Sequence, residues 1–217
     1  MYKRQLSDVV KAANKTMGEI DMPADFTWQF GGTFEDQQDT FSDMIMLMAL
    51  IIVLVFIIMA SQFESLTYPF VIMFSIPFAV TGVLMGLFVT GTPLSIMAML
   101  GLLMLIGIVV NNGIVLIDYI MLCRERGLGL VNAIVTSGRS RLRPILMTTL
   151  TTVIGMIPMA VGKGEGSEMW RALGMSVAWG LSFSTLITLI IIPTLYSVFA
   201  RIGIKRARKK ELKTLKK

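Results

Sequence analysis

The sequence predicts an all-α membrane protein with five transmembrane helices, preceded by a short extracytoplasmic α/β fragment. Of the 217 residues, 54% are hydrophobic and 16% are charged, whereas soluble domains carry about 25% charged residues. No Lys or Arg occurs between Lys15 and Arg124. A helix needs roughly 20 apolar residues to cross a bilayer. The apolar stretches near that length are 44–60, 69–90, 97–121, 144–162 and 172–200.

Residues 1–42 precede the first span and combine a helical pattern with a strand pattern. Phe26, Trp28 and Phe30 alternate with other residues, as in a half-buried strand. A lone strand and a single amphipathic helix cannot bury their apolar faces, so we expect this segment to pack on a domain outside the chain. The apolar face of the predicted short helix comprises Leu6, Val9, Val10, Ala13 and Met17.

The first two spans contain several local signals. Thr33, with Asp36 three residues later, resembles a helix start, so we expect a helix from Thr33 into the first span. Pro77 lies within the second span, where neighbouring helices can satisfy the freed backbone groups. Gly82 and Gly86 form a GxxxG pattern, which is typical of close helix packing.

The fourth span is expected to begin at Pro144, because proline suits the first turn of a helix. The preceding residues 128–138 are expected to form an interfacial helix on the cytoplasmic face. Two interpretations apply to the threonines of this span. Their hydroxyls bond to carbonyls of their own helix, or Thr148 and Thr152 form a hydroxyl path. The threonines are Thr148, Thr149, Thr151 and Thr152.

The cations predict the orientation, because Lys and Arg near span ends favour the cytoplasmic side. The basic tail, residues 201–217, carries nine Lys and Arg, and residues 1–43 carry four against eight Asp and Glu. We therefore expect the N-terminus outside and the C-terminus in the cytoplasm, with Cys123 at the cytoplasmic end of the third span. The arginines between the third and fourth spans are Arg124, Arg126, Arg139, Arg141 and Arg143.

Composition excludes several functional classes. The chain has no histidine and one cysteine, so it cannot build a His/Cys zinc site, an imidazole triad or an internal disulfide. We expect no metal, no cofactor and no enzymatic activity. The net charge of +6 is concentrated in the tail, where it favours anionic lipid over nucleic acid.

Three polar residues lie in the third span, and polar groups at membrane depth are costly. Asn111 and Asn112 lie near its middle. Asp118 follows Asn111 by seven residues, nearly two helical turns, so Asn111 and Asp118 are expected to share one face of the helix. The asparagines either line a proton or ion path or hold helices together. Asp118 lies near the cytoplasmic end, which favours a solvated or structural role. An intramembrane aspartyl protease is disfavoured, because such catalysis needs two carboxyl groups.

Three motifs carry a family resemblance: QFESLTYPFVIMFSIPFAVTGVLMG, GLLMLIGIVVNNGIVLIDYI and SGRSRLRPILMTTLTTVIGMIPMA. Together they resemble the C-terminal membrane portion of resistance–nodulation–division (RND) efflux pumps, of the hydrophobe/amphiphile exporter type that includes the acriflavine-resistance proteins. The resemblance implies that the five spans are the last five of twelve. Residues 1–42 would end the second periplasmic loop, which belongs to the porter and docking domains.

The resemblance also implies a function. Such pumps are homotrimers of the bacterial inner membrane that use the proton gradient to expel drugs and other amphiphiles, many with a periplasmic adaptor and an outer-membrane channel. Well-known members have a lysine in this span that pairs with two aspartates of the N-terminal half. Here Asn111 stands at that position, and asparagine cannot pair as a cation. Arg141 and Thr148 match the family's relay positions on the next helix.

Two functional classes therefore stand. The chain is the C-terminal part of a proton-driven secondary transporter, or it is a non-transporting membrane module, either an inert truncation or an accessory subunit such as the protein-export relatives. A reading frame cut from a longer gene is expected, because no signal-peptide pattern follows Met1. An N-terminal half with an intramembrane Asp pair would favour the transporter.

Overall fold

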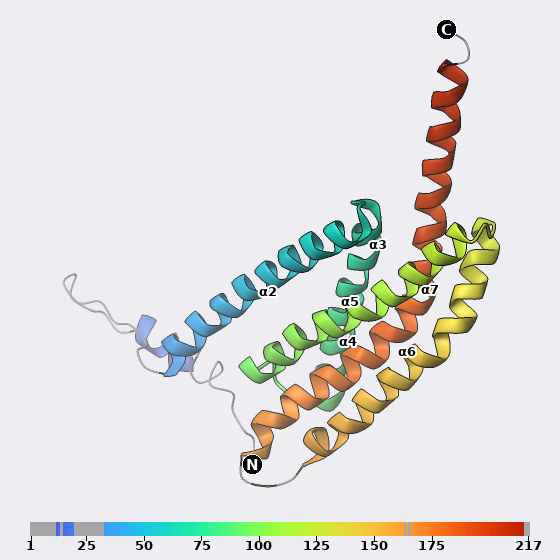
Figure 1. Cartoon of the computed structure of the whole chain (residues 1–217). Helices are drawn as coiled ribbons and strands as arrows, with labels where there is room; N and C mark the ends of the chain where they lie inside the picture. Colours follow the sequence, from blue (N-terminus) through green and yellow to red (C-terminus); the bar gives the residue numbers. More distant parts are fainter. Residues whose placement is uncertain (1–11, 14, 20–32, 163, 165, 215–217) are drawn as a thin grey trace. The chain divides into compact units, whose positions relative to one another are not determined.

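The computed structural model describes residues 12–13, 15–19, 33–162, 164 and 166–214. Its regular elements over these residues are helices (Figure 1). They form five helical segments that are long and apolar enough to cross a membrane, which confirms the five predicted spans. Their bounds are Asp39–Phe63, Thr67–Thr90, Ile96–Glu125, Leu130–Val161 and Met169–Arg201.

Chain contacts separate two units, Met1–Ile45 and Met46–Lys217. In the first unit, residues 12–13 and 15–18 are helical. Ala13 and Met17 are half-buried there, whereas the intervening Thr16 is exposed, as the predicted amphipathic face requires. Leu6, Val9, Val10 and the strand expected at Phe26, Trp28 and Phe30 lie outside the described residues.

Helix α2 is described from Thr33 to Phe63. The residues before Thr33 lie outside the described part, so the helix start expected at Thr33 stays a prediction. Its final turns enter the core, where Met59 and Phe63 are buried. Before them the helix exposes most of its apolar side chains, including Leu50 and Ile58. An apolar surface of this length is unusual in water, and it suits a helix that faces lipid.

The second span is broken into α3, Thr67–Met73, and α4, Ser75–Thr90. Pro77 has no backbone N–H, so the Met73 carbonyl loses its helical donor, and the helix breaks at Phe74. Ser75 lies at the break and donates a hydrogen bond of 2.7 Å to the Ile72 carbonyl. The sequence predicted one continuous helix here, and the structure shows two.

Helix α5, Ile96–Glu125, begins at Ser95, whose hydroxyl accepts a hydrogen bond from the Ala98 amide. Its successor α6, Leu130–Val161, contains Pro144 well inside the helix. The expected start at Pro144 is therefore wrong, and residues 128–138 largely form the beginning of α6 instead of a separate interfacial helix.

Pro144 leaves the Ser140 carbonyl without its helical partner, and Figure 1 shows that α6 bends along its length. Packing compensates for this loss at the beginning of the helix. Ala133 and Ser137 are fully buried, and the Ser137 hydroxyl donates to the Leu116 carbonyl of α5 at 3.2 Å. Neighbouring helices keep a proline-containing helix intact in this way.

Helix α7, Ser167–Thr214, packs against α4, α5 and α6 and continues beyond the last span into the basic tail. Glycines bring α4 close to it. A Cβ atom at Gly82 would lie 2.8 Å from the Cβ atom of Phe183, and one at Gly86 would overlap Trp179. Small residues permit such approach, and the close contact supplies dispersion energy that lipid does not replace.

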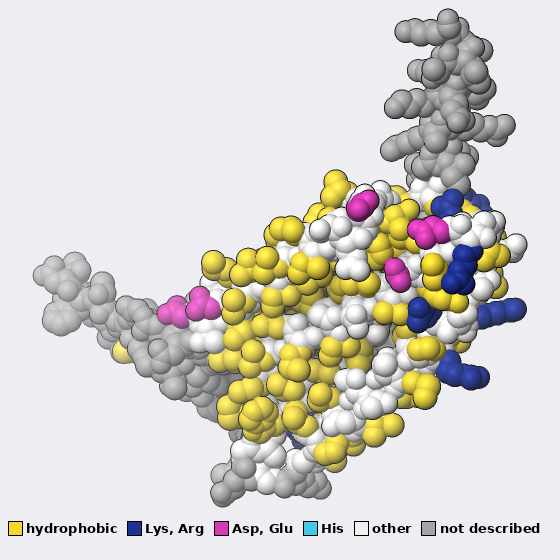
Figure 2. All heavy atoms as spheres, in the orientation of Figure 1, with side chains coloured by type: hydrophobic (Ala, Val, Ile, Leu, Met, Phe, Trp, Pro, Cys, Tyr) yellow, Lys and Arg dark blue, Asp and Glu magenta, His cyan; other side chains and the backbone are white. Residues whose placement is uncertain are grey.

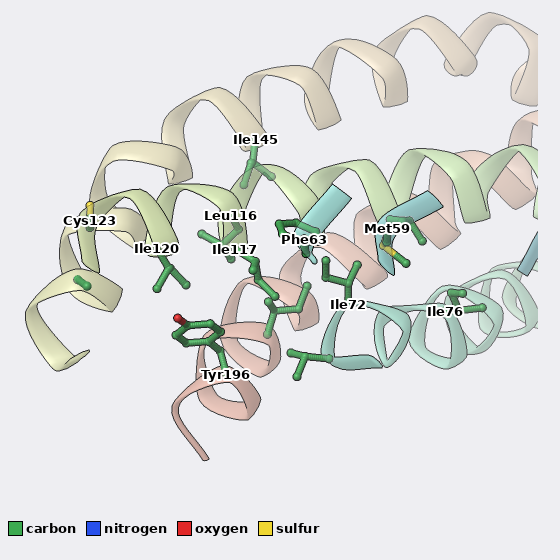
Figure 3. Packing of buried hydrophobic residues seen from close by; sticks show 14 of the residues in the cluster. Met59, Phe63, Ile72, Ile76, Leu116, Ile117, Ile120, Cys123, Ile145 and Tyr196 are labelled. Carbon is green, nitrogen blue, oxygen red and sulfur yellow. The ribbon is translucent and has the colours of Figure 1, made fainter. Parts of the chain in front are cut away.

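The main core cluster joins helices α2 to α7. Figure 3 shows Tyr196 of α7 beside Ile117 and Ile120 of α5. Cys123 belongs to this cluster and is only 2% exposed. The sequence placed it at the end of a span, but its thiol is packed in the core and is therefore a poor native probe of sidedness.

Introduced cysteines provide a test of the predicted orientation. In a Cys123→Ala background, we expect Glu125→Cys, at the exposed end of α5, to react with a membrane-impermeant maleimide only after the membranes are opened. Leu94→Cys lies in the exposed connection between α4 and α5 and is expected to react in intact spheroplasts. Mass spectrometry of the labelled protein measures the reaction at both positions. The reverse labelling pattern would show that the predicted orientation is wrong.

Candidate functional site

A polar pocket of about 280 Å³ lies between α5, α6 and α7. Asn111 and Asn112 contribute from the middle of α5, and Leu181 contributes from α7. These positions are far from the ends of their helices. The remaining lining residues are Ile108, Val115, Pro144, Ile145, Thr148, Thr149 and Thr152.

The two asparagines occupy different environments. Asn111 is exposed in this chain and Asn112 is half-buried. Among the described residues, neither side-chain amide has a hydrogen-bonding partner, so each retains donors and an acceptor. Unused polar groups at mid-span are costly in lipid, which indicates that this face of α5 meets water or polar groups from outside the chain.

The threonine hydroxyls mostly bond within α6. Thr148 donates to the Ile145 carbonyl at 3.0 Å and lies 3.2 Å from that of Pro144, and Thr152 donates to the Thr148 carbonyl at 2.9 Å. Thr151 bonds in the same way to Met147. Their donors are therefore used, as the first of the two interpretations predicted, but the hydroxyl oxygens that line the pocket can still accept a hydrogen bond.

Arg141 lies on α6 about one turn before the pocket-lining Ile145 and does not itself line the pocket. Its guanidinium carbon is 4.5 Å from the centre of the Tyr119 ring of α5, which is cation–π geometry. Its buried Nε atom has no hydrogen-bonding partner among the described residues. The side chain is thus only half-exposed, and the α5–α6 contact holds it in place.

Asp118 is exposed on α5 and does not line the pocket. It shares with Asn111 a helix face that the rest of the chain leaves uncovered, together with Met104 and Gly107. The seven-residue spacing therefore correctly predicted a common face. Figure 2 shows the Lys and Arg side chains gathered toward the end where α5 and α6 join.

Two interhelical polar contacts were not expected from the sequence. Thr149 and Thr185 place their hydroxyl oxygens 3.3 Å apart in the buried α6–α7 contact, and Ser137 joins α6 to α5. Ser137 and Thr185 stand among apolar neighbours, without a pattern that marks a partner. No group of three His, Cys, Asp or Glu suited to a metal ion occurs in the described part of the chain.

Comparison with known families follows from this arrangement of spans and polar residues. A family model described as the AcrB/AcrD/AcrF family matches residues 2–200. The chain belongs to the AcrB/AcrD/AcrF family. Membership agrees with the resemblance to the membrane portion of RND transporters that the three sequence motifs carry.

Similar proteins carry different functional names. The swarming motility protein SwrC of Bacillus subtilis is 41% identical over 199 residues, covering 91% of this chain and 19% of SwrC. The multidrug resistance protein MdtC of an Enterobacter species is 34% identical over 205 residues, covering 94% of this chain and 20% of MdtC.

A crystal structure of a heavy metal efflux pump superposes on this chain with a TM-score of 0.80. The two sequences are 29% identical, and the match covers 93% of this chain and 20% of that pump. The chain therefore spans about a fifth of the length of these AcrB/AcrD/AcrF relatives. The shared fold extends over all five membrane spans, because the superposition covers most of the described residues.

Proposed function

We propose that this chain forms the C-terminal membrane portion of a proton-driven RND efflux transporter, and that Asn111, Asn112 and Thr148 line its proton or water path. The mid-span polar pocket is the observation that carries the proposal. Two unpartnered amides and the threonine oxygens of α6 can orient water inside a bilayer, where such groups are otherwise costly.

Asn111 takes a neutral role in this proposal. An amide cannot change its charge, so it holds a water or a carboxyl partner through its donor and its acceptor. The open face of α5 is where a helix of the N-terminal half would supply that partner. Arg141 and Asp118 lie toward the arginine-rich end, where they would connect the pocket to the cytoplasm.

The assembly follows from the same family membership. We propose that the transporter is a homotrimer in the bacterial inner membrane, that the N-terminal half completes its twelve helices, and that it works with a periplasmic adaptor and an outer-membrane channel. The bare apolar face of α2 supports a lipid-facing position in this assembly.

The cargo proposed first is a drug, as the name of the multidrug resistance protein MdtC suggests, and the family resemblance extends this proposal to other amphiphiles. A metal ion is the second candidate, because a heavy metal efflux pump shares the fold at a TM-score of 0.80. Efflux of a fluorescent dye and of Zn²⁺, measured with the same cells, separates these two cargoes.

Transport by the isolated chain tests the proposal directly. Alternating access requires two repeats that move about a site between them, so we expect the 217-residue chain alone to confer no dye efflux. Expression together with the rest of a related transporter should restore it. Efflux by the chain alone, in cells that lack related pumps, would contradict the proposal that it is one part of a transporter.

A further inference from the structure

A second pocket, of about 250 Å³, lies near the end of α5 that carries the arginines. It is lined by the turn after α2, by α3, by Arg124 of α5 and by α7. None of these residues belongs to the polar pocket around Asn111. The lining residues are Ser65, Thr67, Tyr68, Val71, Arg124, Tyr196, Phe199 and Ala200.

Tyr196 is the unusual residue of this pocket. It is 1% exposed, and its buried hydroxyl has no hydrogen-bonding partner in the described part of the chain. Its ring stacks on Tyr68 with centroids 5.7 Å apart, and the Arg124 guanidinium lies close enough to interact electrostatically with the hydroxyl. Side-chain interactions with Arg124 and Tyr68 act on this hydroxyl, but neither has the geometry of a full hydrogen bond. A buried hydroxyl without a well-formed hydrogen bond costs up to about 1–3 kcal/mol, so the site favours a ligand that accepts hydrogen bonds.

Further donors surround this hydroxyl. The Ser65 oxygen accepts a hydrogen bond from the Thr67 amide at 3.3 Å, which leaves its own O–H free to donate. Arg124 is half-buried and is the only charged side chain among the eight described lining residues. The Arg124 guanidinium can donate two parallel hydrogen bonds, and hydroxyl donors lie in the same pocket. No Asp or Glu is among the lining residues. This combination suits an anion with several oxygens.

The pocket also lies at the depth of a lipid headgroup. α2 ends at Phe63, α3 begins at Thr67, and the last span ends at Arg201. Val71 and Phe199 give the pocket apolar walls toward the spans. A headgroup placed here would keep its phosphate among the donors and its acyl chains against apolar surface.

We propose that this pocket binds a phosphate group, through Arg124 and the hydroxyls of Ser65, Thr67 and Tyr196. The phosphate belongs to an anionic phospholipid headgroup or is free inorganic phosphate. Both sources offer the same oxygens, and Arg is the side chain that matches phosphate geometry with two parallel hydrogen bonds.

Native mass spectrometry of the intact natural protein in detergent tests this site. With phosphatidylglycerol as the probe, we expect Arg124→Gln to lower lipid occupancy about tenfold and Tyr196→Phe about threefold, as expected for losing a charged and a neutral hydrogen bond. Arg124→Lys keeps the positive charge but loses the planar guanidinium group. Its lipid occupancy should lie between those of Arg124→Gln and Tyr196→Phe. Arg126→Gln is the matched control, since Arg126 is exposed nearby but does not line the pocket.

Competition identifies the source of the phosphate. If inorganic phosphate displaces the lipid from the wild type but not from Arg124→Gln, the free ion is the ligand. If only phospholipids compete, with phosphatidylcholine weaker than phosphatidylglycerol, the headgroup is the ligand. Equal losses for Arg124→Gln and Arg126→Gln, or no loss for Tyr196→Phe and Arg124→Gln, would overturn the phosphate site.

Discussion

Replacing Asn111 with Leu in a full-length transporter is expected to lower substrate-driven proton movement more than tenfold. Leucine matches asparagine roughly in size but removes both the donor and the acceptor that face the mid-span pocket. A water or carboxyl partner would then lose its hydrogen bonds in a region without bulk water. Dye efflux and proton counterflow in proteoliposomes under an imposed pH gradient measure the effect.

Asp118→Asn is the comparison variant for this experiment, with a smaller expected effect. Asp118 shares the open face of α5 with Asn111 but does not line the pocket, so its replacement should lower transport less. Trimer assembly and membrane insertion should remain normal in both variants. Normal transport by Asn111→Leu, or a loss explained by dissociation of the trimer, would show that the polar centre of α5 only holds helices together.

Replacing Gly86 with Ala is expected to destabilise the membrane bundle by about 1–3 kcal/mol, the usual cost of overpacking. The added methyl group would overlap the Cβ and Cγ atoms of Trp179, so α4 and α7 would have to separate. The effect should appear as a lower Tm of the detergent-purified transporter and as reduced membrane yield.

Gly155→Ala serves as the control, because a Cβ atom at Gly155 meets nothing within 4 Å. Alanine has the higher helix propensity, so this variant should be as stable as the wild type or slightly more stable. Gly82→Ala should resemble Gly86→Ala, since its Cβ atom would lie 2.8 Å from that of Phe183. Equal Tm values for Gly86→Ala and Gly155→Ala would refute close packing at this contact.

The sequence predicted the spans well because membrane insertion depends on local composition. An apolar stretch of sufficient length must form a helix in lipid, since its backbone groups have no other partners. The common face of Asn111 and Asp118 follows from helical periodicity alone.

Prolines were harder to interpret from sequence. Pro77 breaks the second span at Phe74, whereas Pro144 lies inside a continuous α6. A proline always removes one donor, but neighbouring packing decides whether the helix ends, breaks or only bends. At Pro144, buried Ala133 and Ser137 pack the turns before the proline, and buried Ile145 and Thr149 pack the turns after it, so α6 stays one element.

The sequence by itself therefore determined the membrane class, the spans, the helix faces and the polar residues at mid-depth. Only the tertiary structure decided that Asn111 and Thr148 line one pocket, that Cys123 is buried, and that Tyr196 lies beside Arg124. Hydrophobicity and hydrogen bonding within a helix depend on residues close together in the chain, so they can be predicted from the sequence. Contacts between helices depend on side-chain shape across segments far apart in the chain, and in lipid no simple hydrophobic pattern marks which faces meet.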